Sequence, residues 1–108
     1  MDGYENLAHA IILRAVKDYR RNMRFLKKHP VTDSLKKAIK ARKQERSLIY
    51  KRTGEKPPLS DEERLMSKII GCKREISGIE QFFHSNWYSI LTDIPGEYLL
   101  SKLKEELK

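Results

Sequence analysis

The sequence has few residues that could form covalent cross-links, bind metal or cross a membrane. Cysteine occurs once, at Cys72, so no internal disulfide can form, and three scattered histidines complete no zinc site. The longest apolar run near the N-terminus, residues 7–13, is interrupted by His9 and followed by Arg14. We therefore expect neither a signal peptide nor a membrane span, and a cytoplasmic protein without a metal or other cofactor.

Glycine and proline are scarce, and no segment alternates apolar and polar residues long enough to indicate a strand. The chain has five glycines and four prolines among 108 residues. Apolar residues instead recur every three or four positions, which is typical of helices. A chain of this length can bury one modest core. We predict an all-α fold, a small helical bundle of about four helices that forms a single domain over residues 1–108.

Local signals predict where the helices begin and end. His29 and Pro30 end the first helix, because the residue before a proline is pushed out of the α region. Ser60 and Glu63 have the spacing of a capping box, in which each side chain bonds the backbone N–H of the other residue. Ser85 or Asn86 can cap a short turn. The expected helices cover about residues 4–28, 34–50 and 60–84, a short turn over 87–91, and a last segment after Pro95.

Acidic residues are scarce in the first half of the chain. Residues 1–54 hold 15 Lys and Arg against 5 Asp and Glu, whereas residues 55–108 hold 8 against 10. A field concentrated on one element can recruit a polyanion, while an even distribution mainly keeps a protein soluble. The charge asymmetry therefore indicates an anionic partner.

The cations of the first helix form a stripe opposite its apolar face. A line of cations binds phosphates and releases their counterions, giving affinity without sequence information. Lysines of the second helix extend this field if the two helices pack antiparallel. The alternative is a solvated helix face on which Asp18 offsets its neighbours. The predicted anion-binding residues are Arg14, Lys17, Arg20, Arg21, Arg24, Lys27 and Lys28 on the first helix and Lys36, Lys40 and Lys43 on the second. The chain has no helix-turn-helix signature, so we do not expect sequence-specific DNA binding.

An aromatic cluster near residue 85 contains Phe82, Phe83, Trp87 and Tyr88. Such a density of rings favours the packing centre of a small core, with Trp87 as its anchor and Tyr88 and His84 on a polar rim. The alternative is that Phe83 and Tyr88 stack a nucleic-acid base.

No set of residues indicates catalysis. Cys72 lies within a helical apolar pattern and is expected to be a small buried hydrophobe. The carboxylates of Glu62 and Glu63 suit a helix N-terminus, and those of Glu105 and Glu106 suit a solvated tail. We therefore expect that the protein is not an enzyme.

Several short segments carry a resemblance: residues 4–7, 15–20, 79–88, 91–93 and 96–99. In these segments the chain resembles small uncharacterised helical proteins encoded by bacterial prophages. The resemblance covers both ends of the chain, whereas residues from about 32 to 62 carry none of it and are expected to be variable. It implies a viral protein in the cytoplasm of a bacterial host, and it brings no assigned activity.

Three functions are compatible with these observations. We predict a non-enzymatic phage accessory protein whose basic N-terminal helical face binds nucleic acid or a nucleic-acid-handling host complex. A second hypothesis is an anti-defence protein, an oligomer that sequesters a host signalling nucleotide through Arg20, Arg21 and Arg24 and an aromatic ring. The third is a structural protein–protein interaction module. In each case we expect the chain to form a homo-oligomer and not to bind a membrane.

Overall fold

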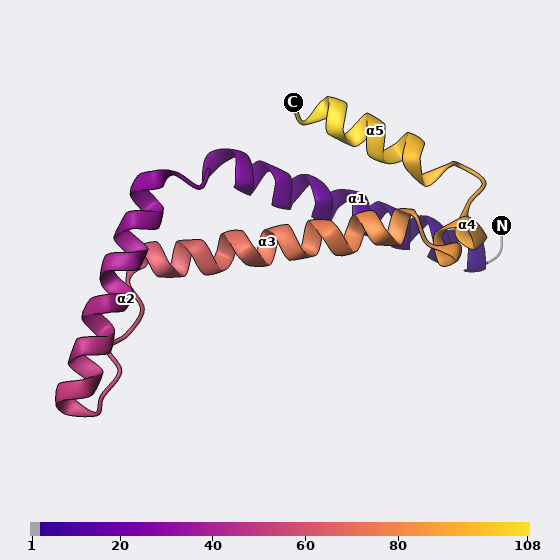
Figure 1. Ribbon diagram of the computed structural model, residues 1–108. Helices are drawn as coiled ribbons and strands as arrows, with labels where there is room; N and C mark the ends of the chain where they lie inside the picture. The colour runs from indigo at the N-terminus through magenta and orange to yellow at the C-terminus, as the bar shows by residue number, and fades with distance from the viewer. Residues whose placement is uncertain (1–2) are drawn as a thin grey trace. The chain divides into compact units, whose positions relative to one another are not determined.

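The computed structural model describes residues 3–108, which form five helices and no strand (Figure 1). The all-α prediction is confirmed, and the predicted helix boundaries lie within about three residues of the observed ones. The helices are α1 (Gly3–Lys28), α2 (Asp33–Thr53), α3 (Asp61–Phe83), α4 (Asn86–Leu91) and α5 (Gly96–Glu106).

The chain is divided into two compact units. The first contains α1 together with residues 72–108, and the second contains residues 29–71. The long helix α3 contributes its first turns to the second unit and its remainder to the first. The single domain expected over residues 1–108 stays a prediction.

The core of the first unit is built around Tyr19 of α1, which is 1% exposed. Its hydroxyl donates a hydrogen bond to Glu80 Oε1 at 3.5 Å, and three residues later Asn22 Nδ2 donates to Glu75 Oε2 at 2.8 Å. A higher residue number in α1 is paired with a lower one in α3, so the two helices run antiparallel within this unit. The side chains buried with Tyr19 come from α3, α4 and α5 and are Ile76, Phe83, Tyr88, Leu100 and Leu103.

The short helix α4 reverses the chain after α3. Its N-cap is Ser85, whose Oγ accepts a hydrogen bond from the backbone N–H of Tyr88 at 3.1 Å. Gly96 then begins α5 directly against the backbone carbonyl of Phe83. The far end of α5 reaches α1, where Arg20 Nε donates to Glu106 Oε2 at 3.0 Å. The close approach at Gly96 and this ion pair fix the two ends of α5.

The aromatic cluster contributes to the core, but the buried and the exposed members differ from those that the sequence predicted. Trp87, the expected anchor, is 54% exposed, whereas Tyr88, expected on the rim, is 2% exposed. The Ser85 cap sets the rotation of α4 so that position 88 faces inward and position 87 outward. Trp87 meets Phe82 in an edge-to-face arrangement, with ring centroids 5.4 Å apart. Cys72, expected to be buried, is half-buried.

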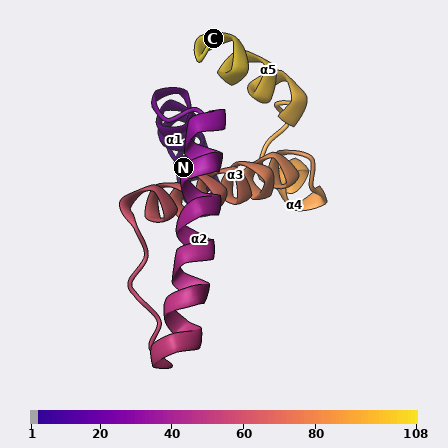
Figure 2. The same ribbon diagram turned by 60° about the vertical axis from the view of Figure 1, so that its left-hand side comes forward.

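The second unit begins with the capped helix α2. Thr32 is its N-cap, and Thr32 Oγ1 accepts a hydrogen bond from the N–H of Leu35 at 3.1 Å. Gly54 ends the helix in the left-handed conformation, with φ of 74°, and its N–H donates to the carbonyl of Tyr50 at 2.8 Å. This conformation suits glycine, which has no Cβ. The following loop, residues 54–60, runs back beside α2 to the start of α3 (Figures 1 and 2).

The predicted capping box at the start of α3 is confirmed. The N–H of Glu63 donates to Ser60 Oγ at 3.3 Å, and the N–H of Ser60 donates to Glu63 Oε1 at 3.1 Å. Glu63 is 5% exposed, and Arg46 Nη2 of α2 donates to the same carboxylate oxygen. This bond, with the help of those from Ser60 and against the effect of burial, lowers the pKa of Glu63 from the ordinary 4.5 to about 2. One carboxylate therefore caps α3 and ties it to α2.

The same glycine-to-alanine change is expected to have opposite effects at two positions. At Gly96 the added methyl group would collide with the Phe83 carbonyl, so Gly96→Ala should lower the free energy of unfolding by about 1 to 3 kcal/mol. At Gly78, inside α3, the methyl group meets open space, and Gly78→Ala should raise it by about 1 kcal/mol. Urea denaturation followed by circular dichroism measures both changes. Equal stabilities of the two variants would contradict the close approach at Gly96.

The Glu63 carboxylate is expected to make stability depend on pH. A carboxyl group whose pKa is about 2 in the folded chain and near 4.5 in the unfolded chain stabilises the fold above about pH 4.5. This contribution is lost as the pH falls towards 2. The melting temperature should therefore be higher for the wild type than for Glu63→Gln at pH 7, and the difference should shrink on acidification. A difference that stays constant from pH 7 to pH 2 would contradict the ion pair.

Candidate nucleic-acid interface

The predicted cationic stripe of α1 lies on the side of the helix that faces away from Tyr19. Its members follow one another at steps of three and four residues, so they share one helix face. Over α1 this face is about 21 Å long at 1.5 Å per residue. All five stripe residues are exposed: Arg14, Lys17, Arg21, Arg24 and Lys28.

Carboxylates of the same unit neutralise part of this charge. Asp18 pairs with Arg14 at 3.5 Å and with Arg21 at 3.3 Å, and Arg20 pairs with Glu106 at 3.0 Å. Asp18 thus offsets two of its neighbours, Arg14 and Arg21, as the alternative interpretation of the stripe expected. Other cations on α1 form no ion pair with any residue that the structure describes, namely Lys17, Arg24, Lys27 and Lys28. These four have no carboxylate partner among the described residues, whereas Arg14 and Arg21 share one.

A second cationic face lies on α2. Lys36, Lys40 and Lys43 follow at steps of four and three, and all three are exposed. The buried residue of this helix, Ile39, belongs to a different face. Within residues 3–108 these three lysines form no ion pair. Because α1 and α2 belong to different units, the predicted extension of one field by the other stays a prediction.

The two rings proposed to stack a base are buried in the first unit. Phe83 and Tyr88 contact each other with ring centroids 5.3 Å apart in the core. Burial also raises the pKa of Tyr88, whose hydroxyl has no hydrogen-bond partner among the described residues. Neither ring offers an open face, so this structure contradicts their proposed role in base stacking. The two rings are core residues because α4 folds back over the end of α3.

Two other tyrosines are exposed instead. Tyr50 of α2 is 49% exposed and Tyr98 of α5 is 55% exposed. A lysine ammonium lies over each ring, with Lys56 Nζ 5.8 Å from the centroid of Tyr50 and Lys102 Nζ 5.7 Å from that of Tyr98. Nothing in the local sequence around either tyrosine pointed to an exposed ring.

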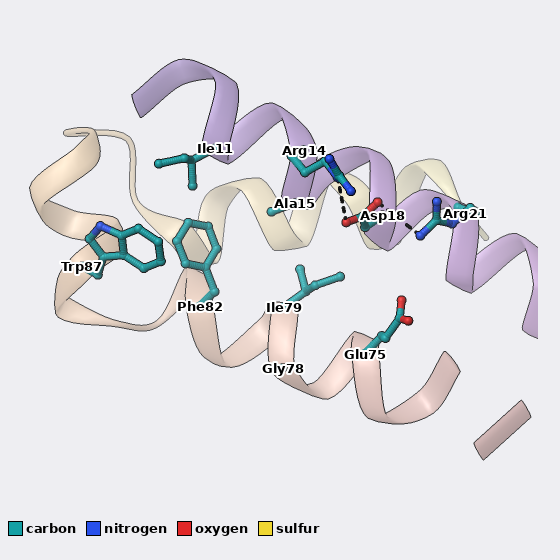
Figure 3. Close-up of a pocket in the computed structure, with 10 residues that line it drawn as sticks. All are labelled: Ile11, Arg14, Ala15, Asp18, Arg21, Glu75, Gly78, Ile79, Phe82 and Trp87. Atoms are coloured by element: carbon teal, nitrogen blue, oxygen red, sulfur yellow. Dashed lines mark ion pairs between the residues drawn. The ribbon is translucent and has the colours of Figure 1, made fainter. Parts of the chain in front are cut away.

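A groove of about 530 Å³ opens on the first unit between α1 and the second half of α3 (Figure 3). Ile11, Ile79, Phe82 and Trp87 give it an apolar surface. The polar residues along it are paired within the protein: Figure 3 shows Asp18 between Arg14 and Arg21, with Glu75 opposite on α3. The two carboxylates and two arginines along the groove leave it without net positive charge, which disfavours a phosphate there. We therefore leave this groove out of the candidate nucleic-acid interface.

Residues 3–108 were also searched for a metal site and for a membrane span. Over this range, His, Cys, Asp and Glu side chains do not gather in any group of three or more that could hold a metal ion. None of the helices described is long and apolar enough to cross a membrane. Comparisons of the chain with protein-family models, with curated proteins and with solved structures found no match.

Proposed function

We propose that this protein acts without catalysis, by binding nucleic acid through the exposed cations of α1 and α2. The observation that carries the proposal is that both helices present cations with no carboxylate partner among the described residues. On α1 these are Lys17, Arg24, Lys27 and Lys28, and on α2 Lys36, Lys40 and Lys43. Unpaired, exposed cations gain most from meeting phosphate, because no internal ion pair must be broken first.

The shape of the charge favours a long anion over a small one. On each helix the cations are strung along the axis, about 16 Å from Lys17 to Lys28 and about 10 Å from Lys36 to Lys43. Phosphates of a nucleic-acid backbone form a matching line, with about 3.4 Å of axial rise per nucleotide. A small nucleotide gains more from cations that converge on one cavity. The nucleotide-sequestering alternative also loses support because Arg20 and Arg21 are paired and Phe83 and Tyr88 are buried.

The resemblance to prophage proteins supports a biological setting for this proposal. In that setting the chain is a phage accessory protein in the cytoplasm of a bacterial host. It would bind phage nucleic acid or occupy the nucleic-acid site of a host complex. Contacts to phosphate carry no sequence information, so the binding is expected to be independent of sequence.

Self-association is a second candidate function, and exposed apolar side chains favour it. Leu7, Trp87 and Ile90 of the first unit are all more than half exposed. Large apolar surfaces that remain in contact with water are typical of interaction sites. A homo-oligomer would multiply the cationic faces available to one nucleic acid and thereby increase its avidity.

Charge reversal on α1 tests the proposed function. Binding of a labelled 20-base-pair duplex is measured by fluorescence anisotropy at salt concentrations from about 50 to 200 mM. The logarithm of the binding constant falls linearly with the logarithm of the salt concentration, and each lost phosphate contact makes this slope less steep by about 0.9. The double variant Lys17→Glu/Arg24→Glu should therefore bind more weakly at about 50 mM salt, with a slope smaller by about 2.

The matched control is Lys73→Glu/Arg74→Glu, which changes the net charge equally at exposed cations of α3. It should keep nearly the wild-type slope. Equal losses in the two double variants would mean that only net charge matters and would overturn the assignment to α1. A wild-type protein that binds no oligonucleotide at about 50 mM salt would overturn the proposed function itself.

A further inference from the structure

The second unit contains a cavity of about 520 Å³ between the last turns of α2 and the loop of residues 54–60. Lys43, Ser47 and Tyr50 line it from α2, and Lys56, Pro57 and Leu59 from the loop. Arg46 also contributes to the lining, but Glu63 already engages its guanidinium group. No acidic side chain is among these lining residues, in contrast to the groove of the first unit.

The cavity is held open by bonds at both ends of the loop. At the first end, the left-handed Gly54 donates its N–H to the carbonyl of Tyr50. At the other end, Ser60 bonds Glu63, which is tied back to Arg46 of α2. Pro57 restricts the backbone between them. The loop therefore stands beside α2 before any ligand arrives, and little ordering is required for binding.

Tyr50 gives this cavity a ring with an accessible face. Its side chain is half exposed, and the ammonium of Lys56, an exposed residue, lies over the ring at 5.8 Å from its centroid. Nucleic-acid bases stack on exposed aromatic rings because every base has a π-face, and a neighbouring cation can reach the adjoining phosphate. The volume of the cavity lies within the range found for pockets that take small organic groups.

The cavity also continues the cationic face of α2. Lys43 belongs both to that face and to the cavity lining. A strand whose phosphates follow Lys36, Lys40 and Lys43 would thus bring a base to Tyr50. In a duplex the bases are stacked and paired within the helix, so only an unpaired strand can offer one.

We propose that the cavity beside Tyr50 is a stacking subsite for a base of single-stranded nucleic acid, with Lys43 and Lys56 at the flanking phosphates. This inference rests on the proposed function and deepens it, because it names the unpaired strand as the preferred ligand. It assigns the stacking role to a ring of the second unit in place of Phe83 and Tyr88.

The test compares a labelled 20-nucleotide thymidine strand, alone and annealed to its complement, by fluorescence anisotropy at about 50 mM salt. Loss of one stacked base weakens binding by about 5- to 150-fold. Tyr50→Leu should therefore weaken binding of the single strand by about 5-fold or more and change binding of the duplex less than twofold. Tyr50→Phe keeps the ring and should bind as the wild type does.

Tyr98→Leu is the matched control. Tyr98 is exposed to a similar extent and carries Lys102 over its ring at nearly the same distance, but it lies on α5, outside this cavity. Its replacement should leave binding of both ligands unchanged. An effect of Tyr98→Leu equal to that of Tyr50→Leu would overturn the subsite.

A second measurement uses the unaltered protein and so does not depend on the folding of a variant. A single strand that contains 5-iodouracil is irradiated with the protein, and cross-linked peptides are identified by mass spectrometry. The subsite predicts a cross-link at Tyr50. Cross-links that omit Tyr50, or losses of equal size for strand and duplex in Tyr50→Leu, would overturn the subsite but leave the cationic interface intact. Failure of the wild type to bind either ligand would overturn both proposals.

Discussion

Burial of Tyr19 determines how α1 is rotated about its own axis, and the character of the first unit depends on that rotation. A helix that can turn freely has no defined outer face, but the 1% exposure of Tyr19 and the hydrogen bonds of Tyr19 and Asn22 to α3 allow one orientation. Because the helix repeats every 3.6 residues, Lys17 and Arg24 are then directed to solvent. The same packing that stabilises the unit therefore presents its positive charge.

The ion pair of Arg46 with Glu63 has the corresponding role in the second unit. The buried apolar side chains described in this unit are Ile39 of α2 and Ile69 of α3. Because this apolar contact is small, the bond between Arg46 and Glu63, which also caps α3, helps to orient α2 against the first turns of α3. It holds the returning loop beside α2 and leaves Tyr50 at the edge of a cavity that Lys43 and Lys56 also line.

Features determined by neighbours in the sequence could be predicted, and features determined by distant contacts could not. The capping box of Ser60 and Glu63, the end of α1 before Pro30 and the exposed stripe of α1 follow from spacing alone. The partner of Glu63 lies 17 residues earlier in the chain, and no local rule selects Arg46 over the other cations of α2. The sequence pattern does not show which of two adjacent aromatic residues, such as Trp87 and Tyr88, is buried. The rotation of α4 about its axis decides this. The dense aromatic cluster indicated a core. The position of Tyr50 at a cavity could not be predicted, because the cavity forms only when the loop after Gly54 turns back beside α2.

The proposed function requires that nucleic acid contact particular lysines, and a lysine footprint measures this directly. The protein is acetylated with and without an excess of unlabelled oligonucleotide at about 50 mM salt, and modification at each lysine is quantified by mass spectrometry. We predict protection of Lys17, Lys27, Lys28, Lys36, Lys40 and Lys43, with Lys73 and Lys104 modified equally in both samples. Uniform protection of all lysines, or protection confined to Lys73 and Lys104, would contradict the assignment of the interface to α1 and α2.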